Sequence, residues 1–506
     1  MDDAIWAALP LPGYLDIGIG DLPAEWHVLW PARKDFHDCQ DPKSPSTVVM
    51  STMPPDPSVA AAVPGGSPRS GTLMRFARNA FHIVSGNASA VVLGMITLGL
   101  SAQMLGPALL GILATIEGYG RMVDQIVRLE TWQALIRYGA DALEKRDGER
   151  FRALVKLGVI MDIVGASLSA AVAFIVIPLA AHWLNWDSAT SMMARVYCIA
   201  VLFGISSTPI GVLRLFNRFA AIAWLEPGLA AIRLVGVAVI WILDGSIWAL
   251  LLLGIVVQCA QRLLLGWLAW RELKVQGYGD FLAAPLAHPG DRFPGIWGFI
   301  LAANGTLLVR KSTQEIDLLA VAAIAGPAGA GIYHVVRKFT LAATKAGAMT
   351  QQVVYPDLAR LWARRDLASF ATTIRQVEAV TVAFGFALVG IIVLAGDQII
   401  RIIAGSGFED ATNPLIVQSF AALLFLSGSA LRPGLASMGL QAKMMPAVIV
   451  SAIAFYAVLF TAVPRLGVVG AGFAHIAFNA IWLPASAILF TRSLRRAALD
   501  PSPSTR

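Results

Sequence analysis

Long apolar blocks without ionisable side chains occupy most of this chain. No Lys, Arg, Asp or Glu occurs between Arg78 and Glu117, which leaves room for one membrane-spanning helix and the start of another. Apolar residues make up 57% of the 506 residues and charged residues 14%, whereas soluble chains average about 45–50% and about 25%. A helix satisfies its own backbone hydrogen bonds inside a bilayer. The sequence therefore predicts an all-α polytopic membrane protein.

Twelve apolar segments have roughly the ~20 residues that cross about 30 Å of hydrocarbon. They are 79–105, 107–128, 157–181, 196–213, 219–243, 245–270, 296–325, 331–352, 376–396, 411–431, 444–464 and 466–491. Lys and Arg gather in alternate connections and at both ends, whereas the other connections hold only Arg195, Arg401 and Arg465. Because cytoplasmic loops carry the excess of basic residues, both termini are predicted to be cytoplasmic. These loops explain the net charge of +7, which does not indicate nucleic-acid binding.

The first 70 residues differ in kind from the rest of the chain. They contain eleven prolines and many aspartates, a composition typical of disorder. We expect five parts along the chain: a disordered Pro-rich extension at 1–70, a first lobe of six helices at 71–270, a cytoplasmic linker at 271–292, a second lobe of six helices at 293–495 and a tail at 496–506.

A short turn sequence occurs twice. GPALLGIL at 106–113 and GPAGAGIY at 326–333 share five of eight residues at a separation of 220. Further along, KRDGERF at 145–151 parallels RRDLASF at 364–370 at nearly the same separation. Gly and Pro are common turn residues, so a chance match of the first pair stays open, but the second pair favours a duplication. Two pseudo-symmetric six-helix lobes of the same orientation are therefore predicted, as in transporters built from parallel repeats.

The repeat sets the register of RKSTQEID at 310–317. By hydropathy alone this segment would be an external loop between two apolar runs, and that interpretation stays open. If the turn lies at Gly326 instead, the segment falls inside the seventh span, where the first half has the apolar AVVLGMIT at 90–97. A charge at the bilayer centre costs about 3 kcal/mol or more unless it faces protein or water. The segment and its approach are therefore a candidate functional site: Asn304, Arg310, Lys311, Gln314, Glu315 and Asp317.

The second and eighth spans add further charged stripes. In the second span, the spacing of Glu117, Arg121, Asp124 and Arg128 puts all four on one helical face. This face is either a self-neutralised cytoplasmic half-helix or the wall of a water-filled cavity whose acids bind H⁺ or Na⁺. The eighth span carries an excess of cations, which suits a phosphate or diphosphate but also fits a basic cytoplasmic flank: His334, Arg337, Lys338 and Lys345.

Three other polar side chains lie in or near the predicted spans. Arg233 in the fifth span and Arg262 in the sixth are additional cations near or inside the membrane. His475, like His82, is expected to pack or bond locally rather than to ligate a metal.

Several chemistries lack their sequence motifs. GxxxxGK[ST], HExxH, CxxC and GxSxG do not occur, and the three cysteines have no metal-ligand spacing. The external connections are short, which disfavours a membrane glycosyltransferase or polymerase with its extramembrane platform. The loop RYGADALEKRDGERF also lacks the pattern of a major-facilitator sugar transporter. We expect a transporter rather than an enzyme, with no cofactor or metal, and with H⁺ or Na⁺ as the candidate coupling ion.

The strings EIDLLAVAAIAGPAGAGIYHVVRKF and VVYPDLARLWARRD resemble the seventh-to-ninth helix region of bacterial polysaccharide-lipid flippases. LGPALLGILATIEGYG and LGVVGAGFAHIAFNAIW also resemble that family, which belongs to the multidrug/oligosaccharidyl-lipid/polysaccharide (MOP) exporter superfamily. The resemblance covers roughly residues 75–495. It implies a MATE-like, V-shaped pair of six-helix lobes in the bacterial inner membrane. That family tends to carry an acidic residue where Asp317 stands.

The resemblance implies the transfer of a polyprenyl-diphosphate-linked glycan from the cytoplasmic to the periplasmic leaflet by alternating access, during synthesis of cell-surface polysaccharide such as lipopolysaccharide or exopolysaccharide. Its expected partners are the lipid-linked glycan, membrane lipids and the polysaccharide polymerase and export machinery. The candidate substrate-binding residues are Arg310, Lys311, Asn304, Gln314, His334, Arg337, Lys338, Lys345 and Arg121, and the candidate ion-coupling residues are Glu117, Asp124, Glu315 and Asp317. The alternative is an ion-coupled exporter of organic cations with the same fold.

Overall fold

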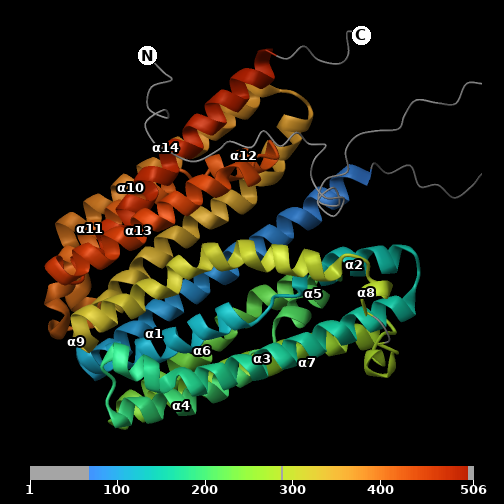
Figure 1. The fold of residues 1–506 in the computed structure, drawn as a ribbon. Coiled ribbons are helices and arrows are strands. Elements are labelled where there is room, and N and C mark those ends of the chain that lie inside the picture. The colour runs from blue at the N-terminus through green and yellow to red at the C-terminus, as the bar shows by residue number, and fades with distance from the viewer. Residues whose placement is uncertain (1–67, 287–288, 500–506) are drawn as a thin grey trace, which may run out of the picture. The chain divides into compact units, whose positions relative to one another are not determined.

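The computed structural model describes residues 68–286 and 289–499, which are helical between short connections (Figure 1). The elements are α1 (Pro68–Val127), α2 (Trp132–Glu144), α3 (Gly148–Leu184), α4 (Ser188–Leu202), α5 (Ser207–Leu215), α6 (Phe219–Ile242), α7 (Ile247–Val275), η2 (Phe281–Ala283), α8 (Pro289–Arg292), α9 (Ile296–Ala363), α10 (Leu367–Ala404), η3 (Ser406–Ala411), α11 (Thr412–Leu426), α12 (Leu431–Ser437), η4 (Ala442–Met444), α13 (Met445–Leu466) and α14 (Val469–Leu499). Of the predicted extension at 1–70, all but the last three residues lie outside the described residues.

Ten stretches of the described chain are long and apolar enough to cross a membrane. This confirms the predicted all-α polytopic class. Two of the ten stretches belong to the longest helices, α1 and α9. Each of these two helices contains an internal reversal, so the chain passes along it twice although the stretch is counted once. The number of twelve spans and the orientation of the termini stay predictions.

The reversals in α1 and α9 lie at the two copies of the repeated turn sequence. Gly106 has φ 67° and ψ 178°, and Gly326 has φ 74° and ψ −177°. Glycine adopts this conformation without the steric cost that a Cβ atom brings, and the following proline begins the next helical segment without losing a needed N–H. Figure 1 shows that α1 and α9 each turn back within their length. Residues 310–317 therefore lie inside α9 and not in a loop.

Residues with positive φ mark the same positions in both halves of the chain. Five pairs are separated by 219 to 223 residues: Gly106 and Gly326, Arg146 and Arg365, Asn185 and Gly405, Asn217 and Gly439, Asp244 and Gly467. The two positive-φ glycines left over in the described ranges, Gly277 and Gly295, lie in the connection between the halves. Since turn positions are set by the backbone path, this agreement shows that both halves follow one plan. The predicted lobe boundaries themselves stay predictions.

The third helix of each half begins at the same kind of cap. The Asp147 carboxylate accepts a hydrogen bond from the Arg150 backbone N–H, and the Asp366 carboxylate accepts one from Ser369. A carboxylate at this position satisfies an N–H that has no partner inside the helix. Hydrogen bonds from the Ser369 side chain and backbone N–H lower the pKa of the Asp366 carboxyl below its ordinary value. KRDGERF and RRDLASF are thus equivalent helix starts.

The fourth span of each half is broken into two helices, α4 and α5 in the first half and α11 and α12 in the second. A carboxylate from the preceding long helix closes each break. Asp162 of α3 accepts from the Thr208 backbone N–H at 2.8 Å, and Glu378 of α10 accepts from Ala430 and Leu431 at 2.9 and 3.1 Å. Asp162 is fully buried, so its charge needs such donors. These two carboxylates are equivalent structural residues.

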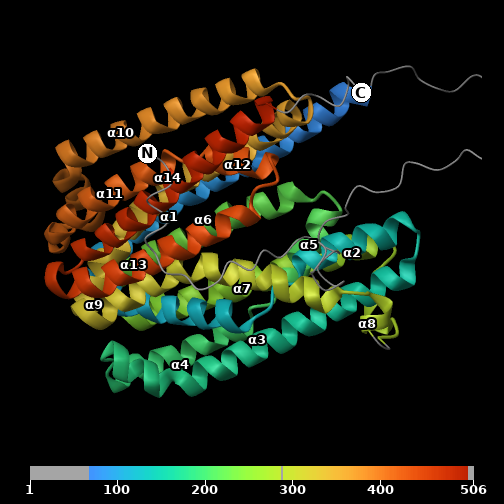
Figure 2. The same cartoon turned by 45° about the horizontal axis from the view of Figure 1, so that its top comes forward.

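The remaining helices gather according to the half from which they come. Figures 1 and 2 both show α3, α4 and α7 together and α10, α11 and α14 together, with α1 and α9 between the groups. Each long helix contacts both groups. Leu98 of α1 packs in one apolar cluster with Ile400 of α10, and Ile300 of α9 packs in another with Leu157 of α3. The two reversing helices therefore carry the contacts that join the halves.

The two hairpins of α1 and α9 touch through glycines. A Cβ atom added to Gly111 would overlap the backbone oxygen of Pro327, and one added to Gly331 would overlap the backbone oxygen of Pro107. Gly111 and Gly331 are the sixth residues of the two repeated turn sequences. The contact is thus reciprocal, with the same residue of each copy against the start of the other. We call it the glycine contact.

Candidate functional site

Two cavities lie along the second segment of α1. We call the first the lysine cavity and the second the arginine cavity, after the cations that line them. The lysine cavity has a volume of about 300 Å³ and is lined by α1, α6, α7 and α9. The arginine cavity has a volume of about 480 Å³ and is lined by α1, α7, α9 and the break between α4 and α5. The charged stripe of α1 serves both, since Glu117 lines the first and Arg121 the second.

The lysine cavity holds three cations and two carboxylates: Arg233, Lys338 and Lys345 with Glu117 and Glu226. Glu117 is already neutralised, because it pairs with Arg233 at 2.9 Å and with Arg121 at 3.4 Å. Lys338 and Lys345 are both exposed to the cavity. No carboxylate of the described residues lies within ion-pair distance of either ammonium group. This cavity therefore offers cations to an incoming anion.

The arginine cavity also holds three cations and two carboxylates: Arg121, Arg128 and Arg262 with Asp124 and Glu130. Arg128 pairs with Asp124 at 2.7 Å and donates to the Ser206 hydroxyl at 3.3 Å. Asn304 of α9 forms two hydrogen bonds with the Glu130 backbone, as acceptor from its N–H and as donor to its oxygen. Asn304 therefore fixes α9 against the end of α1 at the edge of this cavity.

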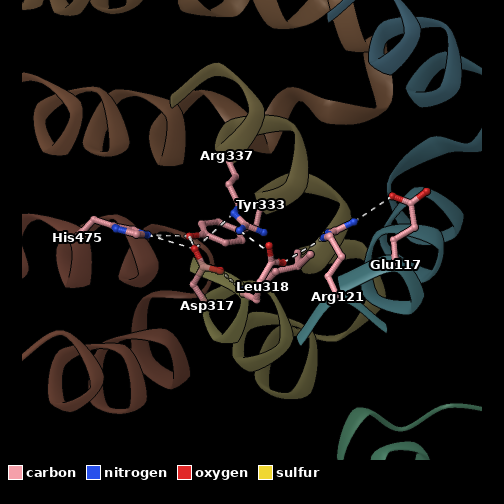
Figure 3. Close-up of polar contacts among 8 residues, drawn as sticks. Glu117, Arg121, Asp317, Leu318, Tyr333, Arg337 and His475 are labelled. Carbon is pink, nitrogen blue, oxygen red and sulfur yellow. Dashed lines mark hydrogen bonds and ion pairs between the residues drawn. The ribbon is translucent and has the colours of Figure 1, made fainter. Parts of the chain in front are cut away.

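A continuous network of ion pairs runs from α6 through α1 and α9 to α14. Arg121 joins the halves, since it pairs with Glu117 on its own helix and with Glu315 of α9 at 3.3 Å. Arg337 continues the network, with nitrogens 3.7 Å from Glu315 and 3.6 Å from Asp317. Figure 3 shows these side chains in line, with Glu117 at one end and His475 at the other. Charges in a low-dielectric interior are tolerated when paired in this way.

Asp317 is the most deeply buried acid of this network, with 1% of its surface exposed. It accepts hydrogen bonds from its neighbour Leu318 N–H at 2.6 Å and from the Tyr333 hydroxyl at 2.8 Å. The His475 Nε2 atom lies 3.3 Å from the same carboxylate. Figure 3 shows Tyr333, Arg337 and His475 all pointing at Asp317. The carboxylate is thus held by three helical segments.

The structure brings most of the predicted site residues together, in three groups. Glu117, Arg121, Glu315, Asp317 and Arg337 form the network, His334, Lys338 and Lys345 line the lysine cavity, and Asp124 and Asn304 line the arginine cavity. The side chains of Arg310, Lys311 and Gln314 lie outside the described residues, although their backbone is part of α9. The roles predicted for these residues in substrate binding and ion coupling stay predictions.

Sequence reasoning left important members outside the site. The sequence predicts Arg233 and Arg262 only as cations near or inside the membrane, and it contains no signal that assigns Tyr333 to the site. His475 contacts a polar side chain, as predicted, but its partner Asp317 is 158 residues away in sequence. No spacing signal links a residue of α14 to one of α9. Helical spacing did identify the Glu117–Arg121 and Asp124–Arg128 pairs, because they lie four residues apart on one helix.

Comparison with known sequences places the chain in a family. Residues 76–362 match the family described as polysaccharide biosynthesis protein. The chain is also 25% identical over 291 residues to "Inner membrane protein YghQ" of Escherichia coli (strain K12), a match that covers 58% of this chain and 82% of that protein.

Comparison with solved structures gives the fold. An inward-facing multidrug resistance MATE family transporter of the MOP superfamily aligns with a TM-score of 0.60 at 14% identity, covering 82% of this chain and 94% of that one. The lipid II flippase MurJ, in an inward closed conformation, aligns with a TM-score of 0.61 at 11% identity, covering 82% and 91%. The predicted MOP-type fold is confirmed by both.

The family match spans more than half of the chain, and the fold agrees with it along its length. This protein therefore belongs to the polysaccharide biosynthesis protein family, and it is a multi-pass helical membrane protein with the fold of the MATE transporter and of MurJ.

Proposed function

We propose that this protein flips a lipid-diphosphate-linked oligosaccharide from the cytoplasmic to the periplasmic leaflet of a bacterial inner membrane. The observation that carries the proposal is the pair of exposed lysines, Lys338 and Lys345, in a cavity whose carboxylate Glu117 is already paired. A diphosphate presents several oxygen acceptors with high negative charge, and ammonium groups bind such charge well. The alternative, export of organic cations, is less favoured, because Arg233, Lys338 and Lys345 line the same cavity as Glu226, which is its one carboxylate without an ion pair among the described residues.

The polar network supplies the second part of the proposal. Glu117 pairs with arginines of the first half and Asp317 with cations of the second, whereas Glu315 pairs with Arg121 of the first half and Arg337 of the second. Alternating access moves such halves relative to each other, so the Arg121–Glu315 pair would be remade during transport. Binding of H⁺ or Na⁺ by one of these acids or by Asp124 would then couple the movement to an ion gradient. Delivery of the flipped glycan to a polymerase or export machinery would follow outside the membrane.

Replacement of the lysines tests the proposal in a strain that lacks the protein. Lys338→Gln and Lys345→Gln should each reduce glycan export about 10- to 100-fold, the range expected for loss of a hydrogen bond to a charged group. Lipid-linked glycan should accumulate on the cytoplasmic face of the membrane. Lys443→Gln is the matched control, since Lys443 is exposed at η4 and lines neither cavity.

Two results would contradict this function. Export at the wild-type level in the Lys338→Gln/Lys345→Gln double variant would remove the lysine cavity from substrate binding. Accumulation of unpolymerised glycan on the outer face in the deletion strain would point to a defect after flipping.

A further inference from the structure

The arginine cavity contains a cation that the network does not use. Arg262 extends from α7 into the wall of this cavity. Its Nε atom is buried and has no hydrogen-bond partner among the described residues. An arginine side chain carries five N–H donors and keeps its charge at any pH that proteins experience. A guanidinium group beside an internal cavity therefore has unused donors.

The other two arginines of this cavity are committed to carboxylates. Arg128 pairs with Asp124, and Arg121 pairs with Glu117 and Glu315. By contrast, no described carboxylate forms an ion pair with Arg262. The cavity also has more space than the lysine cavity, about 480 Å³ against about 300 Å³. An added anion would find a charge-assisted donor and enough room.

We propose that the arginine cavity is a second anion site, with Arg262 as its principal ligand and a phosphate or carboxylate group as its occupant. This inference rests on the proposed function and deepens it. The diphosphate of the lipid carrier, or an acidic sugar beside it, binds at Arg262 as well as at Lys338. Arg121 separates the two positions, because it lines the arginine cavity while its partner Glu117 lines the lysine cavity. An anion in either cavity therefore lies beside an ion pair of Arg121.

Two glycines allow each cavity to be observed by itself. Gly305 lines the arginine cavity and Gly94 lines the lysine cavity. Both are exposed, and a Cβ atom at either position would meet nothing within 4 Å. Gly305→Cys and Gly94→Cys are therefore tolerated reporters in the full chain after replacement of Cys39, Cys198 and Cys259. The measurement is the labelling rate of each cysteine by a small thiol reagent, in the purified protein, with and without farnesyl diphosphate.

Farnesyl diphosphate should slow the labelling of both cysteines. Arg262→Gln should raise the concentration needed for protection at Gly305→Cys about 10- to 100-fold, as expected for loss of a hydrogen bond to a charged group. Arg262→Lys, which keeps the charge, should raise this concentration by a smaller factor. Arg271→Gln is the control, since Arg271 is an exposed residue of the same helix outside the cavity and should leave protection unchanged. Protection by glucuronate but not by farnesyl diphosphate would identify the ligand group as a sugar carboxylate.

Equal protection of Gly305→Cys in the wild-type and Arg262→Gln backgrounds would overturn the second site. Equal protection by farnesol, which has no charge, would overturn it too. The proposed function has its own readout, which is protection of Gly94→Cys and its loss in Lys338→Gln. If that readout holds while Gly305→Cys is unprotected, only the arginine cavity loses its role. If neither cysteine is protected by any anion, both proposals fail.

Discussion

Equivalent positions of the two halves differ: one half has a cavity where the other has buried ionic side chains. Thr97 and Asp317 lie 220 residues apart, each at the same distance before the reversal of its helix. Thr97 lines the open lysine cavity, whereas Asp317 is buried against Tyr333, Arg337 and His475. After the reversals, Glu117 and Arg337 also correspond and carry opposite charge. One half thus keeps the space and the other fills it with an ionic cluster.

This difference shows what a duplicated backbone leaves free to change. The turns, caps and broken fourth spans are the same in both halves because they depend on the backbone path. Side chains that project between helices are free of that constraint. The ionic cluster then stabilises α9 against α14, while the cavity leaves room beside α6 and α7 for a ligand. Four pairs of substitutions test this comparison.

The largest effect is expected at Asp317. Asp317→Leu removes the buried carboxylate shared by Arg337, Tyr333 and His475 and leaves Arg337 only its 3.7 Å pair with Glu315, so it should lower the free energy of unfolding by about 3–5 kcal/mol. Thr97→Val at the equivalent position should cost far less, since the Thr97 hydroxyl bonds only to the Leu93 backbone oxygen of its own helix in the described residues. Thermal unfolding of both variants in detergent measures the difference. Equal losses of stability in the two variants would contradict the difference between the two positions.

The glycine contact should respond in the same way from both sides. Gly111→Ala and Gly331→Ala each force the two backbones apart, which should cost about 1–3 kcal/mol of stability. Gly94→Ala is the control, because a Cβ atom there has open space and alanine favours helix by up to about 1 kcal/mol. The same unfolding assay applies. A large effect at one glycine and none at its partner would break the reciprocity.

The next largest loss of stability is expected at the carboxylates that close the broken fourth spans. Asp162→Ala and Glu378→Ala each leave backbone N–H groups at a helix start without their acceptor, and each should cost about 0.5–2 kcal/mol. The cost at Asp162 should be the larger of the two, because Asp162 is fully buried and Glu378 is half-buried. Hydrogen exchange at Thr208 and Leu431 locates the effect. Unchanged hydrogen exchange at these amides would show that the carboxylates do not stabilise the helix starts.

The smallest effect is expected at the loops before the third helix of each half. Arg146 and Arg365 have φ of 55° and 60°, a conformation that costs a residue with a Cβ atom about 1 kcal/mol. Arg146→Gly and Arg365→Gly should therefore raise stability slightly and by the same amount. Opposite signs in the unfolding assay would show that these two turns are not equivalent.

The sequence predicted the path of the backbone better than the partners of the side chains. The repeat located the reversal at Gly326 and so placed residues 310–317 inside a helix, against their hydropathy. Glu315 contacts Arg121 of α1 and Arg337 beyond the reversal of its own helix. Such contacts join helices that are distant in sequence. Spacing along one helix holds no information about such contacts. The ionic cluster at His475 could therefore be identified only from the structure.

The glycine contact has a mechanical consequence. At Gly111 and Gly331 the two hairpins meet backbone to backbone with no side chain between them. We expect this close point near the hairpin tips to act as a pivot. Since a helix of 20 residues is about 30 Å long, a rotation of about 10° at this pivot moves the far end of each hairpin by about 5 Å. A small rotation at the glycine contact would therefore change the spacing of the helices at the far ends of the hairpins.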